Sequence, residues 1–360
     1  MDRLTVDRYQ RDSDVYAGRP AGDGPQDRLR AFIGSTPAGV RLDAGCGTGR
    51  YLTELGSPAV GLDASTAMLA HAARAAPAVP LACGDLAQLP LRTGSIAGAW
   101  ANKSLQHLPD VEVPHALAEL HRVLAVGGRL DVQVFEGDAA GRTPPDSDLP
   151  DRLFTGFSTE LLADLLEGAG FAQVEIAAGE PDRDGLYRPL TATAGRDRTL
   201  ADTVGPGMRL LLCGLNPSLY AADAGVAFAR PGNRFWPALR AAGLTDLDRD
   251  PNGLLRIDNI GLTDLVKRAT LGADELNAAE YTHGLARVRR LCDRLRPAAV
   301  CFIGLAGWRA ALDRTAVAGW QTGGLGETPV YLMPSTSGLN AHASSVQLAE
   351  HLAAAAALPG

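Results

Sequence analysis

Three short segments in the second half of the chain carry the side chains best suited to chemistry. They are Cys213-Gly214-Leu215-Asn216-Pro217-Ser218, Ala227-Phe228-Ala229-Arg230-Pro231-Gly232-Asn233-Arg234-Phe235-Trp236 and Met333-Pro334-Ser335-Thr336-Ser337-Gly338-Leu339. The first and the last follow short apolar runs, residues 209–213 and 330–333, which are typical of buried strands. Open α/β sheets bind ligands outside the carboxyl ends of their strands, so we expect these two loops to meet at one pocket.

In this order, the motifs resemble the mismatch-specific uracil-DNA and thymine-DNA glycosylases, and the resemblance runs from about residue 207 to the C-terminus. It implies hydrolysis of the N-glycosidic bond of uracil, or of a related mismatched or damaged pyrimidine in duplex DNA, to leave an abasic site. Such an enzyme flips the base out of the helix, stabilises the leaving base and brings water to an electron-poor sugar. No cofactor or metal is implied for this half.

The resemblance assigns roles to single residues. Asn216 matches the catalytic asparagine, whose amide orients water; with no carboxylate at this position the site lacks an ordinary general base, and slow turnover is expected. Phe228 matches the ring that stacks on the flipped base, and N–H groups from Leu215 to Ser218 would bind the carbonyl oxygens of the base. Leu339 matches the wedge that fills the gap in the helix.

Further residues are candidates for holding DNA. They are Ser335, Thr336, Ser337, Asn233, Arg234 and Lys267. The three hydroxyl residues would grip phosphates. The asparagine and the arginine could cap the helix that follows or contact a phosphate, and the lysine, which precedes Arg268, could instead belong to a solvated face.

Two aromatic residues and one methionine complete this half. Phe235 and Trp236 are expected in the core, at the start of a helix. Some relatives carry Asn or His where Met333 stands, and Met cannot donate a hydrogen bond to a base. This departure leaves open which base is excised.

A second motif, Leu42-Asp43-Ala44-Gly45-Cys46-Gly47-Thr48-Gly49, follows an expected strand and opens an expected helix. Asp63 lies 20 residues after Asp43, a spacing found in nucleotide-binding units. With later segments, these residues resemble class I S-adenosylmethionine-dependent methyltransferases of the small, ubiquinone-biosynthesis-like type, over residues 38–194.

The resemblance implies that S-adenosyl-L-methionine is the cofactor of this half. The matching residues are Asp43, Gly45, Gly47 and Gly49 beneath the methionine part, Asp63 at the ribose, and Asp85 and Leu86 at the adenine. The alternative, a nicotinamide-binding loop, fits the segments around residues 85 and 127–128 less well. The methyl acceptor is unknown, and His107 is open between a base and a structural role.

At 360 residues the chain is long enough for two domains. Strands alternate with helices throughout, which predicts two three-layer α/β/α domains: a Rossmann-like methyltransferase fold at residues 1–194 and a uracil-DNA-glycosylase-like fold with a short parallel sheet at residues 208–360. Residues 195–207 are polar, end in Gly-Pro-Gly and are predicted as a linker. Residues 256–260 are predicted as a strand of the second sheet.

The net charge of −7 belongs to the first half. Residues 1–200 hold 19 Lys and Arg against 27 Asp and Glu, whereas residues 201–360 hold 15 against 14. A near-neutral second half predicts modest, salt-sensitive affinity for DNA. Five scattered cysteines argue against a disulfide framework, and no apolar run reaches the roughly 18 residues of a membrane span, so a cytoplasmic enzyme without a membrane partner is expected.

Two rival functions remain. The chain could be a methyltransferase for a small molecule or RNA, with a degenerate glycosylase half, although Asn216, Phe228 and Leu339 are all present. Alternatively, the first half could be a non-catalytic, cofactor-sensing module that regulates repair.

Overall fold

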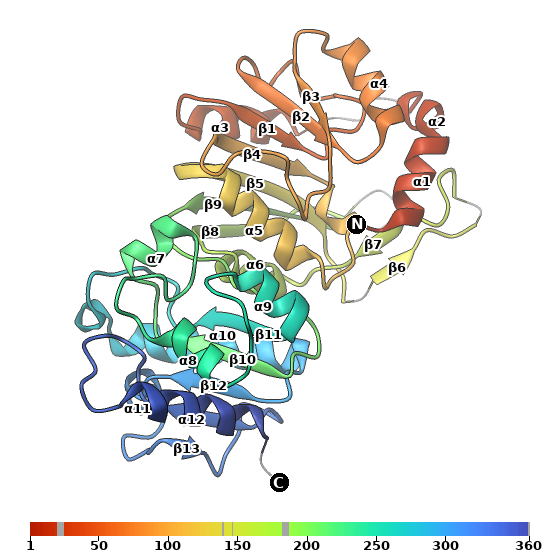
Figure 1. Ribbon diagram of the computed structural model, residues 1–360. Helices are drawn as coiled ribbons and strands as arrows, with labels where there is room; N and C mark the ends of the chain where they lie inside the picture. Colours follow the sequence, from red (N-terminus) through yellow and green to blue (C-terminus); the bar gives the residue numbers. More distant parts are fainter. Residues whose placement is uncertain (20–24, 139, 146, 182–186, 359–360) are drawn as a thin grey trace. The chain divides into compact units, whose positions relative to one another are not determined.

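The computed structural model describes residues 1–19, 25–138, 140–145, 147–181 and 187–358. The chain forms two compact units, Met1–Asp197 and Arg198–Gly360, and each has its own sheet and its own helices (Figure 1). Among the described residues, no helix is both long enough and apolar enough to traverse a membrane.

The first unit is built on a seven-stranded sheet with the order β3-β2-β1-β4-β5-β9-β8. The strands are β1 (Arg41–Ala44), β2 (Ala59–Asp63), β3 (Leu81–Cys83), β4 (Ile96–Asn102), β5 (Leu124–Phe135), β8 (Phe171–Ala178) and β9 (Pro189–Arg196). All pairs are parallel except those of β9, which runs antiparallel to both neighbours. The order reverses between β1 and β4, which places a ligand-binding crevice at their carboxyl ends.

Helices cover both faces of this sheet. They are α1 (Arg3–Arg11), α2 (Ser13–Ala17), α3 (Gln26–Ser35), α4 (Thr66–Ala75), η1 (Leu105–His107), α5 (Val113–Val123) and α6 (Thr159–Gly168). The apolar sides of α5 and α6 share one core with the central strands, whereas α3 packs on Trp100 from the other face. A small hairpin, β6 (Ala140–Arg142) with β7 (Leu153–Thr155), lies outside the sheet.

The second unit has a five-stranded sheet with the order β11-β10-β12-β14-β13. Its strands are β10 (Leu210–Gly214), β11 (Ile260–Asp264), β12 (Val300–Ile303), β13 (Gly319–Trp320) and β14 (Val330–Met333). Only β13 is antiparallel to its neighbour. The four parallel strands are buried along their whole length, as expected for a sheet covered on both faces.

Alternate residues of these strands point into two separate cores. One core contains α10 (Ala278–Leu295) and α11 (Ala306–Ala311), and the other contains α8 (Phe235–Ala241), α9 (Pro251–Asp258) and α12 (Ser345–Ala356). Phe235, Trp236 and Met333 are all buried in the second core. The predicted fold class, two α/β domains with a Rossmann-like first sheet and a short parallel second sheet, is confirmed.

Two predictions about local structure are wrong. Residues 256–260 do not form a strand: Asp250 caps α9 by accepting a hydrogen bond from the Gly253 N–H at 2.8 Å, and the helix runs to Asp258. Asn259 then turns in the left-handed conformation (φ 53°), and the strand begins at Ile260. Within residues 256–260, the first apolar residue belongs to the last turn of α9 and the second begins β11.

The segment predicted as a linker, residues 195–207, is also structured. Gly195 lies inside β9, and Thr203 pairs with Leu262 of β11 through two backbone hydrogen bonds of 2.9 and 2.8 Å. Asp202 is buried. Most of this polar segment is therefore part of the second unit, and one of its charged residues, Asp202, is paired inside that unit.

Asp202 is the centre of that buried charge cluster. Its carboxylate accepts hydrogen bonds from Lys267 Nζ at 2.7 Å, Arg287 Nη1 at 2.8 Å and Thr263 Oγ1 at 2.7 Å. Burial alone would raise the pKa of Asp202, but Arg287 and Lys267 hold it below the usual value. Arg287 also donates to the backbone oxygen of Asp264 at 2.7 Å, so the cluster fixes the end of β11.

We expect Asp202→Asn to lower the free energy of unfolding of the second unit by about 3–5 kcal/mol, because it leaves two buried cations without their counter-charge. Three of the four tryptophans lie in this unit, so denaturant unfolding followed by tryptophan fluorescence reports mainly on it.

The matched control is Asp223→Asn, which removes an exposed carboxylate paired with Arg198 and should change the free energy by about 0–1 kcal/mol. Equal effects of the two substitutions would contradict a stabilising role for the cluster.

Candidate active sites

The candidate site of the second unit lies where β10 and β11 end. Gly214 is in register with Asp264, and the two chains stay paired beyond the sheet through Leu265 N to Gly214 O (2.8 Å) and Val266 N to Leu215 O (2.9 Å). A Cβ on Gly214 would lie 2.4 Å from Asp264 Oδ1, so only glycine fits here. The loop that carries Asn216 is thus held beside the segment that follows β11.

Asn216 is fixed by that neighbouring segment. Its Nδ2 donates to Arg268 O at 3.0 Å and to Thr270 Oγ1 at 2.7 Å, and Thr270 N donates to Pro217 O at 3.2 Å. A carbonyl oxygen can only accept, so the atom facing Arg268 O must be the amide nitrogen. This leaves Oδ1 of Asn216 as the atom that can accept a hydrogen bond from water.

Phe228 lies against Asn216's loop with a backbone conformation that is uncommon outside glycine (φ 58°). Its ring stacks on Phe235, with centroids 3.9 Å apart and planes at 22°, and its tip approaches Gly214. Because Phe235 is fully buried at the start of α8, the Phe228 ring has a rigid support. A planar ligand could extend this stack.

The two other predicted base-binding residues have structural side chains. Ser218 Oγ caps α7 (Leu219–Ala224) by accepting from Ala221 N at 3.2 Å. The Leu215 side chain packs toward Gly307 and the core of α10 and α11. The Leu215 side chain is therefore directed into the core, whereas Ser218 Oγ, which accepts the capping bond, keeps an O–H that can donate to a ligand.

The loop after β14 forms a turn that holds Leu339 in solvent. Ser335 Oγ accepts from Ser337 N at 3.2 Å, and Ser337 Oγ accepts from Leu339 N at 3.3 Å. Leu339 is 86% exposed, but Thr336 is only 1% exposed. The prediction that all three hydroxyl residues grip phosphates is wrong for Thr336, which is buried beneath the loop.

Three predicted DNA contacts are corrected or decided by the structure. Asn233 Oδ1 accepts from Phe235 N at 3.0 Å, which favours the capping alternative for this residue. Arg234 donates only to backbone carbonyls among the contacts of the described residues. Lys267 is 6% exposed and paired with Asp202, so the prediction that it contacts DNA is wrong. Its neighbour Arg268 is exposed and pairs with Glu280.

Asp264 is a candidate that the sequence analysis missed. It is 7% exposed, and within the described residues its carboxyl oxygens accept no hydrogen bond. Burial raises the pKa of Asp264 to about 6, although the charge of Lys267 opposes the shift. The carboxyl lies beside Gly214, whose open side also faces the Phe228 ring. The sequence signal that could have pointed to Asp264 is an acidic residue at the end of an apolar run, residues 260–264.

The candidate site of the first unit is a cavity of about 220 Å³ at the ends of β1, β2 and β4. Gly45 and Cys46 donate from their backbone N–H groups to Leu62 O at 2.8 and 2.9 Å, which folds the glycine loop over β2. A Cβ on Gly45 (φ 85°) would collide with Ser104. Five of the predicted cofactor residues line the cavity: Gly45, Gly47, Asp63, Asp85 and Leu86.

Asp63 ties the glycine loop to the next helix. Its Oδ2 accepts from Gly47 N at 2.8 Å and its Oδ1 from Ser65 N at 2.9 Å. Burial raises the pKa of Asp63, and these backbone N–H groups oppose the shift. Each oxygen keeps a lone pair that could accept from a ligand hydroxyl.

The other two predicted cofactor residues, Asp43 and Gly49, are not among the residues that line the cavity. Asp43 is fully buried, its Oδ2 has no hydrogen-bond partner, and burial, followed by the charge of Asp63, raises its pKa to about 8. Gly49 lies outside the lining: a Cβ there would be 2.9 Å from Ala72 Cα, so this glycine permits close packing of α4. A role for Gly49 beneath the methionine part of the cofactor stays a prediction.

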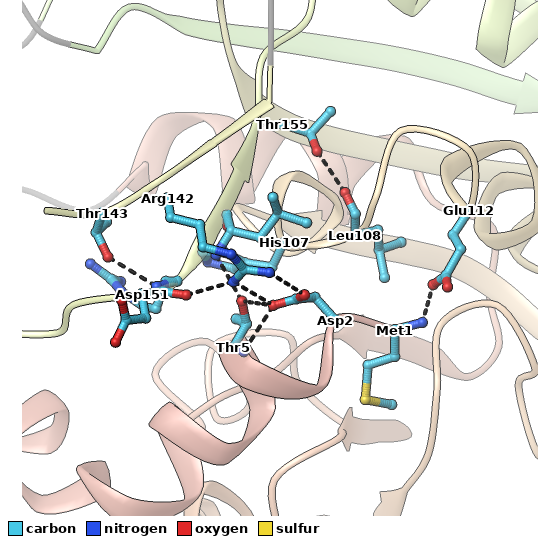
Figure 2. Close-up of polar contacts among 12 residues, drawn as sticks. Met1, Asp2, Thr5, His107, Leu108, Glu112, Arg142, Thr143, Asp151 and Thr155 are labelled. Carbon is cyan, nitrogen blue, oxygen red and sulfur yellow. Dashed lines mark hydrogen bonds and ion pairs between the residues drawn. The ribbon is translucent and has the colours of Figure 1, made fainter.

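Helix α1 forms one wall of this cavity, which the sequence did not reveal. Asp2 caps the helix by accepting from Thr5 N at 2.9 Å, and Arg142 of the hairpin donates to both Asp2 oxygens at 3.0 and 2.8 Å (Figure 2). The bond from Arg142 holds the pKa of Asp2 at about 2. Leu153 N also donates to Thr5 Oγ1 at 2.8 Å, so the hairpin fastens the helix.

His107 is part of the same fastening. Its Nδ1 lies 2.7 Å from Leu153 O, which can only accept, so Nδ1 carries the proton and Nε2 accepts from the Tyr9 hydroxyl at 3.1 Å. Arg152 in turn donates to Tyr9 at 3.0 Å. Burial lowers the pKa of His107 to about 4. Both ring nitrogens are engaged, which favours the structural alternative over a catalytic base.

Two family models match parts of the chain. The methyltransferase domain model matches residues 42–132, and the model of the uracil DNA glycosylase superfamily matches residues 201–358. The two matches lie in different units of the chain. The second match spans the whole candidate site around Asn216, and the first spans the glycine loop, Asp63 and Asp85.

Two of the solved structures similar to the chain are described as methyltransferases. One is a SAM-dependent methyltransferase from Methanosarcina mazei, with 18% identity over 47% of this chain and 97% of that chain, at a TM-score of 0.41. Another is 1,6-didemethyltoxoflavin-N1-methyltransferase of Burkholderia thailandensis, bound to 1,6-didemethyltoxoflavin and S-adenosylhomocysteine, with 27% identity over 53% of this chain and 85% of that chain, at a TM-score of 0.43.

If the second unit catalyses base release, as its superfamily match suggests, we expect the rate to depend on the ionisation of Asp264. If the carboxylate form assists the reaction, the single-turnover rate should rise with pH and level off above about 6, where Asp264 loses its proton. Asp264→Asn keeps the shape but cannot ionise, so its rate should be lower and flat across this range. A variant with the wild-type pH profile would exclude this role.

Proposed function

We propose that the second unit is a DNA repair glycosylase that hydrolyses the N-glycosidic bond of uracil, or of a related mismatched or damaged pyrimidine, in duplex DNA and leaves an abasic site. The observation that carries this proposal is the fixed amide of Asn216. Its nitrogen is bound by Arg268 O and Thr270 Oγ1, so its oxygen can accept from the attacking water.

The surroundings of Asn216 support the same chemistry. The supported ring of Phe228 offers a stacking surface for an extruded pyrimidine, and backbone N–H groups of the 215–218 loop are candidates for its carbonyl oxygens. Leu339, the most exposed large apolar side chain of the described residues, suits a wedge that replaces the extruded base in the helix. Asp264, once ionised, would favour positive charge developing on the sugar.

We infer that Met333 does not decide which base is excised. This side chain is fully buried in the core with α8 and α12, so it does not contact a base, and its lack of a donor carries no penalty there. Asp264 and Phe228 are the side chains beside Gly214 that could select among uracil, thymine and damaged pyrimidines.

The direct test is base release from a labelled duplex with a single G·U pair, read as alkali-sensitive strand cleavage. Asn216→Ala should lower the single-turnover rate by at least about tenfold, or about 1.4 kcal/mol, because the water loses its acceptor. Thr270→Val should give a smaller loss, because it frees the amide without removing it.

Wild-type and variant should bind the same duplex equally well, since Asn216 acts after binding. Absence of release across G·U, G·T and ethenocytosine duplexes would exclude the glycosylase proposal and favour methyl transfer as the main activity of the chain.

We propose in addition that the first unit binds S-adenosyl-L-methionine and transfers its methyl group to an acceptor that the sequence does not identify. The residues fit this cofactor: Asp43 Oδ2 and Ser104 Oγ are buried without partners under the glycine loop, where a cationic methionine end would lie. Asp63 could accept from the ribose hydroxyls. When bound, the cofactor supplies a methyl group activated on a sulfonium.

We expect cofactor affinity to rise with pH up to about 8. Below that pH Asp43 is protonated, and a cationic ligand must displace this proton to gain the carboxylate. Calorimetry at pH 7 in two buffers of different ionisation enthalpy should show proton release by the wild type and less release by Asp43→Asn. Equal proton release by the wild type and Asp43→Asn would show that Asp43 does not lose its proton when the cofactor binds. If the wild type bound no cofactor at all, both the catalytic and the sensing roles of the first unit would be excluded.

A further inference from the structure

Arg234 links two loops that the glycosylase proposal uses for different tasks. Its Nη2 donates to Asn340 O at 2.7 Å and to Ser337 O at 3.2 Å, and its Nη1 donates to Ala343 O. The three acceptors are backbone carbonyls spread over seven residues of the segment after β14. One guanidinium therefore gathers this whole segment around itself.

Backbone contacts strengthen the link. Arg234 N donates to Thr336 O at 3.0 Å, and a Cβ on Gly338 would lie 2.8 Å from Gly232 O, so the two loops meet glycine against glycine. Asn340 Nδ2 closes the second loop on itself by donating to Ser335 O at 2.8 Å. Neither loop can shift without disturbing the other.

The linked loops hold the wedge side chain and the stacking ring. Leu339 lies at the tip of residues 335–340, here called the wedge loop, and it is 86% exposed although its loop is tightly bonded. Phe235, directly after Arg234, supports the Phe228 ring. Pre-ordering an exposed side chain lowers the conformational entropy that it loses on binding.

The hydrogen-bonding capacity of Arg234 argues against a phosphate contact. Nη1 and Nη2 are used on carbonyls, and Nε is buried without a hydrogen-bond partner, so the guanidinium edge needed for a bidentate phosphate contact is not available.

We propose that Arg234 is a positioning residue that sets the wedge loop relative to the base-stacking ring before DNA binds. This inference rests on the proposed glycosylase function, because the wedge role of Leu339 does. Arg234 should therefore affect the rate of base release from duplex DNA, where a base must be extruded and its place in the helix filled. It should have little effect on release from single-stranded DNA, where no such gap forms.

The test compares Arg234→Ala and Arg234→Lys with Arg230→Ala, which removes an exposed arginine four residues earlier. On a G·U duplex, Arg234→Ala should slow single-turnover base release by about tenfold, while release from the same uracil-containing single strand stays close to wild type. Lys at 234 should not restore the rate, because one ammonium cannot serve three separated carbonyls. Equal losses on duplex and single strand would overturn the proposal.

Salt dependence separates positioning from phosphate binding. Each lost phosphate contact reduces the slope of log affinity against log salt by about 0.9. We expect Arg234→Ala to keep the wild-type slope for duplex binding, and a reduction of this size would assign a phosphate to Arg234. In a Leu339→Ala background, Arg234→Ala should lower the rate of base release from duplex DNA little further, because both substitutions remove the positioned wedge side chain.

Hydrogen exchange distinguishes failure of this inference from failure of the proposed function. Amides of residues 335–343 should exchange faster in Arg234→Ala than in the wild type or Arg230→Ala, and this requires no activity. If the wild type releases no base from either substrate but the exchange rises, the glycosylase proposal fails and the positioning of the loop stands. Unchanged exchange would overturn the role of Arg234 in either case.

Discussion

The candidate site of the second unit depends on two parallel strands whose pairing continues after the sheet ends. Hydrogen bonds from Leu265 and Val266 carry the pairing of β10 and β11 into their loops. Because of this continuation, Arg268 O and Thr270 Oγ1 come within reach of the Asn216 amide. Helices cover both faces of the sheet, but the alignment of the Asn216 loop with the segment after β11 comes from backbone hydrogen bonds between the two.

Buried charge has opposite consequences in the two units. Asp202 is surrounded by Lys267, Arg287 and Thr263, so its charge is satisfied and it serves to fix β11. Asp43 is as deeply buried, yet one of its oxygens has no partner and its pKa is raised to about 8. A buried carboxyl that lacks a cation is costly, and a cationic ligand would relieve that cost.

The sequence was sufficient for what depends on local pattern. Apolar runs followed by polar motifs correctly predicted the α/β fold class of both units, and Asn216 follows the end of β10 as expected. It was insufficient where a distant partner decides the environment. Lys267 resembles a surface lysine until Asp202, 65 residues away, is seen to neutralise it. The same holds for Asp264, whose burial follows from packing, and for helix α1, whose place over the cavity is set by Arg142.

Asp63 ends β2 beside the glycine loop that follows β1, and Asp264 ends β11 beside Gly214 of β10, yet the two carboxyl groups differ in their hydrogen bonds. Asp63 accepts hydrogen bonds from Gly47 and Ser65, which hold the carboxylate in one orientation suited to binding hydroxyls. Asp264 receives no such bonds among the described residues, and its pKa of about 6 lets it change charge near neutral pH. Similar positions at strand ends thus give the Asp63 carboxylate a fixed orientation and leave the Asp264 carboxyl able to change charge.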